Sequence, residues 1–158
     1  MSVNLSLLKQ VREILNELLE KMGIKAAIST RATEKFLFVD ISDVNPDSKI
    51  LIGRNGEVLL ALQLILSMIV IRKLSPDFQI ILDIEGYRQK REKALIAMTH
   101  RWAKQVLEKH DKLVLSPMRP FERRIVHITL QDEYPALETN SIGDDPYRQV
   151  VISSKKNE

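Results

Sequence analysis

Two short motifs in this sequence contain residue types that could bind an anionic chain. The first, Gly53-Arg54-Asn55-Gly56, has a glycine at each end of a four-residue turn that lies between the apolar runs 50–52 and 58–62. Because glycine has no Cβ, the backbone of such a turn can approach another molecule closely. At the start of a helix its free amide N–H groups, together with Arg54, would point outward and could hold a phosphate. A two-glycine turn is weak evidence by itself, because plain helix–helix connections also contain it.

The second motif is Arg123-x-x-x-His127, within the segment 121–127. Residues four apart share one face of a helix, and Arg124 lies three residues before His127. The planar guanidinium of arginine suits phosphate, and a neutral imidazole can form hydrogen bonds or stack. The alternative is that His127 is a structural residue whose ring is satisfied by its neighbours.

The distribution of charge points to the same class of ligand. The net charge of the chain is only +3. Residues 86–127, however, contain 11 lysines and arginines against 4 acidic residues, a net charge of +7. Basic charge concentrated in one segment is the electrostatic footprint expected for binding a polyanion. For any single lysine the alternative is a solvated helix face.

Composition argues against several other classes of protein. The sequence has no cysteine, which excludes disulfides, thiolate metal sites and cysteine nucleophiles. Its three histidines lack metal-ligand spacing and no glycine-rich P-loop motif occurs, so we expect no metal, no cofactor and no enzyme. The start lacks the pattern of a signal peptide, and the longest apolar run, 58–71, is interrupted by Gln63 and Ser67. We therefore expect a cytoplasmic protein without membrane insertion.

Apolar spacing along residues 5–85 predicts the order helix, strand, strand, short helix, glycine turn, long helix, strand. The first helix has apolar residues at steps of three and four as far as Met22, and Gly23 would end it. Ser75-Pro76 would end the long helix. The three strands and the two later helices are expected at residues 25–30, 36–41, 78–84, 49–52 and 57–74.

This order resembles that of a type II K-homology (KH) domain, a three-stranded sheet with helices on one face whose G-x-x-G loop joins two helices. The resemblance implies that Gly53 and Gly56 let the loop approach a sugar–phosphate backbone, with Arg54 and Asn55 contacting phosphate. Ile52 would give the bases an apolar floor, and base edges would meet backbone groups of the neighbouring strand. The loop has one basic residue where relatives often have two, which implies a lower affinity.

From Gly86 the pattern predicts a second unit that combines two helices with three short strands. Its first helix runs to about Lys109, and the expected buried stripe is Leu95, Met98, Trp102 and Val106. Pro120 suits the first turn of the next helix and makes Arg119 its cap. The residues of that helix expected to point inward are Phe121, Ile125 and Ile128. The strands are expected at residues 112–115, 136–141 and 147–152.

Arg123-x-x-x-His127 is also the signature of the R-3-H domain, a small α/β domain that binds single-stranded nucleic acid. Two further stretches, Asp83-Ile84-Glu85-Gly86-Tyr87-Arg88 and Asp145-Pro146-Tyr147-Arg148-Gln149-Val150-Val151-Ile152, resemble one setting of that domain. Together with the KH pattern, they are similar to the bacterial Jag/KhpB family, the SpoIIIJ-associated RNA-binding proteins. The implied α+β architecture is a type II KH domain, an R-3-H domain and a polar tail at residues 1–85, 86–152 and 153–158.

The resemblance implies a non-catalytic protein that binds single-stranded RNA, with single-stranded DNA as a further ligand. Such proteins act post-transcriptionally in cell division and envelope growth, often beside a small KH-only partner. Jag proteins commonly carry an additional N-terminal domain, which this sequence is expected to lack. The residues expected to contact nucleic acid are Ile52, Gly53, Arg54, Asn55, Gly56, Arg88, Arg119, Arg123, Arg124, His127 and Arg148.

Two alternatives to simple RNA binding remain at this point. The helix at 57–74 is apolar nearly all round, so either the first helix covers the surplus or the surface binds a protein. That partner would be a second copy, giving a homodimer, or a KH-only protein, giving a heterodimer, and the chain would be an adaptor. The other alternative is a helix–turn–helix DNA binder built on residues 50–74. The flanking strands and the single basic residue of the loop argue against it.

Overall fold

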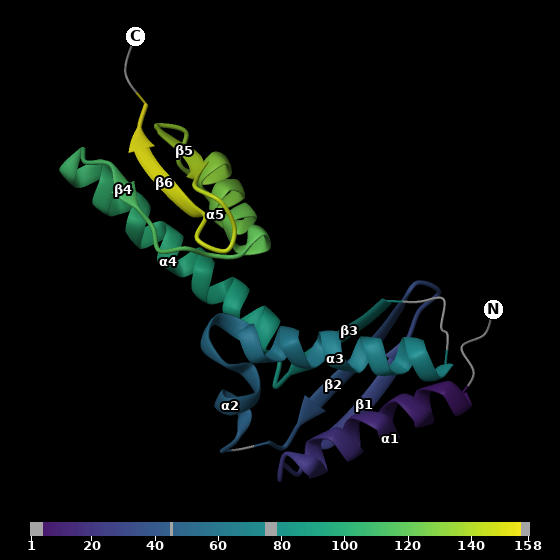
Figure 1. The fold of residues 1–158 in the computed structure, drawn as a ribbon. Helices are drawn as coiled ribbons and strands as arrows, with labels where there is room; N and C mark the ends of the chain where they lie inside the picture. The colour runs from purple at the N-terminus through teal and green to yellow at the C-terminus, as the bar shows by residue number, and fades with distance from the viewer. Residues whose placement is uncertain (1–4, 45, 75–78, 156–158) are drawn as a thin grey trace. The chain divides into compact units, whose positions relative to one another are not determined.

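The computed structural model describes residues 5–44, 46–74 and 79–155, and the chain divides into two compact units, Met1–Arg88 and Gln89–Glu158. Each unit combines helices with a three-stranded sheet (Figure 1). The fold class is therefore α+β, as predicted.

The first unit has the element order that the KH resemblance implies. Its elements are α1 (Leu5–Lys21), β1 (Ala27–Ala32), β2 (Phe36–Ser42), α2 (Ser48–Ile52), the 3-10 turn η1 (Arg54–Gly56), α3 (Glu57–Leu74) and β3 (Gln79–Ile84). In the sheet, β2 lies between β1, which is antiparallel to it, and β3, which is parallel to it. The predicted bounds differ from these by at most two residues. Ser75-Pro76 and Phe78, expected to end α3 and to begin β3, lie outside the described residues.

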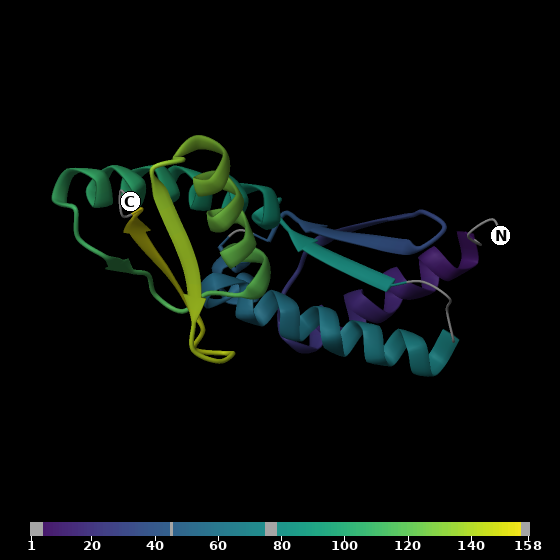
Figure 2. The same cartoon turned by 90° about the horizontal axis from the view of Figure 1, so that it is seen from above.

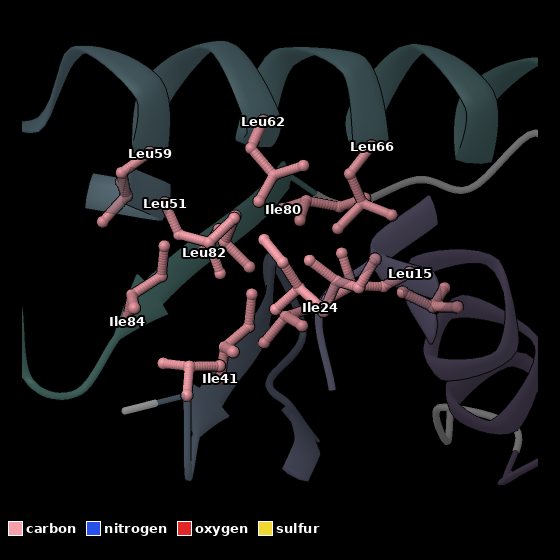
Figure 3. Close-up of a cluster of buried hydrophobic side chains, with 14 of the residues drawn as sticks. Leu15, Ile24, Ile41, Leu51, Leu59, Leu62, Leu66, Ile80, Leu82 and Ile84 are labelled. Carbon is pink, nitrogen blue, oxygen red and sulfur yellow. The ribbon is translucent and has the colours of Figure 1, made fainter. Parts of the chain in front are cut away.

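Both long helices of the first unit cover the same face of its sheet. Figure 2 shows the purple α1 and the teal α3 on one side of the three strands. Along β2 and β3 every second residue is buried, because alternate side chains of a strand point to opposite faces. In the core, Leu59, Leu62 and Leu66 of α3 point toward the strands, and Ile80 and Ile84 lie on β3 below them (Figure 3).

The second unit consists of two helices and a separate antiparallel sheet. Its elements are α4 (Tyr87–Lys109), β4 (Leu113–Val114), α5 (Pro120–Glu133), β5 (Leu137–Ile142) and β6 (Gln149–Ser154), with strand order β4-β6-β5. Strand β6 runs two residues beyond its predicted end, because Ser153 and Ser154 pair with Glu138 and Leu137 of β5. Residues 156–158 of the predicted polar tail lie outside the described residues.

The buried stripe of α4 differs in part from the predicted one. Leu95 and Val106 are buried as expected. Met98 and Trp102 are only half-buried, and the smaller Thr99 and Ala103 take the buried positions between them. The Thr99 hydroxyl donates to the Leu95 carbonyl at 2.8 Å, so its burial leaves no unpaired polar group.

The predicted inward face of α5 is wrong. Phe121 and Ile128 are each 46% exposed, and Ile125 is half-buried. The buried residues of this helix are Glu122, Arg123, Val126, Thr129 and Leu130. Two charged residues can lie inside because each has an ionic partner in the same unit: Arg91 for Glu122 and Asp145 for Arg123. Hydrophobic periodicity treats charged residues as outward-facing, so it selected the wrong side of the helix.

The Glu122 carboxylate connects α5 to α4 and also caps α5. One oxygen accepts a hydrogen bond from Arg91 Nε at 2.7 Å, and the other accepts from the backbone N–H of Arg119 at 3.1 Å. Arg119 has extended backbone angles and Pro120 follows it at the first helical position, which confirms the predicted cap. The Glu122 side chain is 1% exposed, so the stability of this carboxylate depends on Arg91.

We expect Arg91→Met to destabilise the second unit by about 3 kcal/mol, because it leaves the Glu122 carboxylate buried without its cationic partner. The only tryptophan of the chain, Trp102, packs against the core of this unit, so its fluorescence in a urea titration reports the unfolding. Adding Glu122→Leu should restore most of the lost stability, since replacing both members of a buried pair by apolar residues is often neutral.

The matched control is Arg101→Met, the same substitution at an exposed position of α4. It should change the free energy of unfolding by less than about 0.5 kcal/mol. If Arg91→Met cost no more than this control, the ion pair would not support the unit.

Candidate nucleic-acid interface

The predicted glycine loop forms a surface turn between α2 and α3. Gly53, Asn55 and Gly56 have positive φ angles of 71°, 51° and 77°, a region that glycine adopts readily and asparagine more easily than most residues. Arg54 and Asn55 are exposed at the tip of the turn. The preceding Ile52 is half-buried against the first core, at the foot of the turn.

Both glycines are required by contacts within the chain. A Cβ on Gly53 would collide with the side chain and backbone nitrogen of Val58, and one on Gly56 would lie 2.8 Å from the ring of Tyr87. Contacts with Val58 and Tyr87 thus account for both glycines within the chain, and the expected approach to a sugar–phosphate backbone stays a prediction. These contacts fix the turn and leave the side chains of Arg54 and Asn55 pointing outward.

Arg88, the last of the predicted site residues that fall within the first unit, is half-buried and already bonded. Its Nε donates to the Leu82 carbonyl at 3.1 Å, and its Nη2 donates to Gln63 Oε1 at 2.9 Å. Its backbone N–H donates to Asp83 at 3.2 Å. Arg88 therefore bonds to the outermost strand of the sheet.

In the second unit, Arg123 is only 8% exposed. Its Nη1 donates to the Met118 carbonyl at 2.8 Å and to Asp145 Oδ1 at 2.7 Å. The hydrogen bond from Arg123 lowers the pKa of the Asp145 carboxyl below its usual value. Arg123 thus connects the start of α5 to the turn between β5 and β6.

The ring of His127 is bonded to strand β5 through both nitrogens. Its Nδ1 lies 2.6 Å from Thr139 Oγ1 and its Nε2 lies 2.9 Å from Ser141 Oγ. Burial, and then the positive charge of Arg123, lower the pKa of His127, so the imidazole is neutral at neutral pH. Both nitrogens are satisfied by neighbours, as in the structural alternative considered from the sequence.

A pocket of about 430 Å³ opens beside His127. Its volume falls in the range of small-ligand sites. The residues that line it are His127, Leu130, Gln131, Pro135, Leu137, Thr139 and Lys155. Sequence reasoning identified only His127 among them. The others come from α5, the loop after it, β5 and the residue after β6, and only the fold brings these segments together.

The remaining predicted arginines differ in accessibility. Arg124 is exposed on α5, whereas Arg119 and Arg148 are half-buried. The Nε of Arg148 is buried and has no hydrogen-bond partner among the described residues. The structure therefore leaves Arg54, Asn55 and Arg124 as the most accessible of the predicted polar contacts.

The described part of the chain contains neither a metal-binding cluster nor a membrane-spanning helix. Within residues 5–44, 46–74 and 79–155, no group of three or more His, Asp or Glu side chains could hold a metal ion. Over the same ranges, no helix combines the length and the hydropathy needed to cross a membrane.

Comparison with known proteins places the chain in a family. A family model described as the R-3-H domain matches residues 93–154. A protein named RNA-binding protein KhpB from Clostridium symbiosum is 34% identical over 145 residues, which are 91% of this chain and 64% of that protein. The chain belongs to the KhpB family.

Other family members share the same region. KhpB of Bacillus subtilis is 28% identical over 150 residues, 94% of this chain and 71% of that protein. KhpB of Lactiplantibacillus plantarum is 30% identical over 107 residues, 68% of this chain and 33% of that protein. The chain thus spans slightly less than two thirds of the C. symbiosum KhpB and one third of the L. plantarum KhpB.

We expect the second unit to lose stability as the pH falls below about 6.5, the usual pKa of histidine. The folded pKa of His127 is lowered, so the unfolded chain binds this proton more tightly. The stabilisation is fully present above the unfolded pKa and is lost as the pH falls toward the folded one. Urea titrations followed by Trp102 fluorescence between about pH 7.5 and 5 measure it.

His127→Gln should flatten this pH dependence, whereas His110→Gln, at an exposed position, should preserve it. A dependence that stays equally steep in His127→Gln would show that another group is responsible.

Proposed function

We propose that this chain is a non-catalytic protein that binds single-stranded RNA, with single-stranded DNA as a further ligand. The observation that carries the proposal is the glycine turn, which presents Arg54 and Asn55 at the amino end of the 18-residue helix α3. The positive end of the helix dipole favours an anion at this place. The family members from C. symbiosum and B. subtilis are named RNA-binding protein KhpB, which supports the same ligand.

In the second unit the proposal assigns phosphate contacts to the exposed Arg124 and to the accessible parts of Arg119 and Arg148. Arg123 holds the turn between β5 and β6, and His127 forms one wall of the neighbouring pocket. Unpaired bases of RNA are commonly held in such pockets and on ring faces. Arg123 and His127 therefore hold the turn and the pocket wall in place. His127 would also contact a base through the face of its ring.

The finer biological role rests on the family resemblance. We place the protein in the cytoplasm, as a post-transcriptional regulator linked to cell division and envelope growth. The helix–turn–helix alternative receives less support, since α2 has only five residues and the turn after it belongs to a sheet-containing unit.

We expect Arg54→Asp combined with Asn55→Asp to weaken binding of a single-stranded RNA at least tenfold, because two carboxylates at the tip of the turn would repel phosphate. Fluorescence anisotropy with a labelled RNA measures the dissociation constant. Both positions are exposed, and aspartate tolerates the positive φ at position 55, so the fold should be retained.

The matched control is Arg72→Asp combined with Lys73→Gln, at exposed positions near the other end of α3. It changes the net charge by the same amount. Equal losses in the two variants would show that overall charge, and not the glycine turn, determines RNA affinity.

A surface on α3 supports a protein partner as well. Leu64, Ile65, Met68 and Ile71 are between 46% and 62% exposed and form one stripe along the helix. Helix α1 packs elsewhere on α3, and the described residues of the first unit leave this stripe exposed. A contiguous apolar surface usually marks an interaction site. We propose that it binds a second copy of the chain or a KH-only protein.

We expect the protein to form a concentration-dependent dimer that Met68→Glu converts to a folded monomer, because a charge in a buried apolar contact is costly. Sedimentation velocity over a range of concentrations measures this. Ile142→Glu, the same kind of change at an exposed apolar position of the second unit, should leave the dimer intact. A wild-type protein that is strictly monomeric and recovers no KH-only protein from cells would exclude the stripe as an interface.

A further inference from the structure

The outer side of strand β3 has an unusual hydrogen-bonding pattern. Strand β3 is an edge strand of its sheet, so it pairs with β2 on one side only. The N–H groups of Gln79 and Glu85 donate to carbonyls in and beside β2. In a parallel pair, alternate residues point their N–H and C=O groups the same way, so those of Ile80, Leu82 and Ile84 point to the open side.

Side chains form hydrogen bonds with both the N–H and the carbonyl of Leu82. The N–H donates to Gln63 Oε1 at 3.0 Å, and the carbonyl accepts from Arg88 Nε at 3.1 Å. Arg88 Nη2 donates to the same Gln63 oxygen at 2.9 Å, which closes the network. We call Leu82, Gln63 and Arg88 the capped edge. It accounts for a glutamine within the apolar helix α3 and for the arginine that ends the stretch Asp83–Arg88.

The capped edge lies beside the glycine turn. Tyr87 places its ring against Gly56, and the next residue, Arg88, bonds to Leu82. The Asp83 carboxylate accepts the Arg88 backbone N–H at 3.2 Å and holds this segment in place. A nucleotide whose phosphate is bound at the turn therefore has the capped edge as its neighbour.

Capping changes the hydrogen-bonding groups that a base would meet. An open strand edge offers one N–H donor and one carbonyl acceptor, which complement the amino group and ring nitrogen of adenine. In the capped edge, Gln63 Oε1 already accepts two hydrogen bonds. What remains on the two side chains is the Gln63 amide NH2 and the other guanidinium N–H groups of Arg88, all of them donors. Guanine presents two acceptors, O6 and N7, on one edge, and arginine is their commonest partner.

We propose that the capped edge makes the first unit select guanine over adenine at one nucleotide position beside the glycine turn, with Gln63 and Arg88 as the specificity-determining side chains. The inference rests on the proposed function, because it presupposes RNA binding. Recognition of a base by free backbone groups of β3 would instead favour adenine. A comparison of guanine with adenine therefore distinguishes recognition by the backbone from recognition by the Gln63 and Arg88 side chains.

The test uses two fluorescent RNAs of about seven uridines that differ only in a central guanosine or adenosine, titrated with the full chain and followed by anisotropy. The wild type should bind the guanosine probe about tenfold more tightly. Arg88→Lys keeps the charge but loses the planar fork, so affinity for the guanosine probe should fall toward that for the adenosine probe. Gln63→Leu combined with Arg88→Met opens the Leu82 edge and should bring the ratio to one or below.

Ser67→Ala is the matched control, because it removes another polar side chain of α3, one whose hydroxyl donates to the Gln63 carbonyl at 2.7 Å. It should keep the guanosine preference. A wild type that binds neither probe overturns the proposed function together with this inference. A wild type that binds both equally, or prefers adenosine, overturns this inference alone. An unchanged ratio in Arg88→Lys, with an unchanged circular dichroism spectrum, also overturns it.

Discussion

A buried polar group needs a hydrogen-bonding or ionic partner, and this constraint determines where the polar side chains inside both units lie. Glu122 and Arg123 enter the second unit because Arg91 and Asp145 meet them there. Gln63 is tolerated in the apolar helix α3 because it bonds to the outer strand. In each case one polar side chain joins two elements that are distant in sequence, so it specifies their arrangement as well as satisfying itself.

The glycine turn shows how a structural and a functional requirement can coincide. Positive φ angles and the proximity of Val58 and Tyr87 exclude side chains at Gly53 and Gly56. The same contacts leave Arg54 and Asn55 outside. A turn fixed in this way loses little conformational entropy when it binds a phosphate, which favours affinity. The contact with Tyr87 also brings the segment Asp83–Arg88 next to the turn.

The two residues that define the R-3-H spacing occupy a supporting position in this protein. The guanidinium of Arg123 donates hydrogen bonds to Asp145 and to the Met118 carbonyl. Both ring nitrogens of His127 are hydrogen-bonded to hydroxyl groups. A pair of this kind can still be indispensable for binding, because it holds a turn and a pocket wall in place. Accessible positive charge in the second unit comes instead from neighbours such as Arg124.

The sequence alone determined the α+β class, the order of the elements, the glycine turn and the cap at Arg119, because local spacing and backbone preferences encode these features. Only the tertiary structure decided which face of α5 is buried, how Arg88, Arg123 and His127 are bonded, and that the α3 stripe is uncovered. The buried face of α5 and these hydrogen bonds depend on partners that lie far away in sequence, such as Asp145 for Arg123 or Leu82 for Arg88. Residue types and local periodicity do not predict such partners, because two side chains distant in sequence come into contact only when the elements pack.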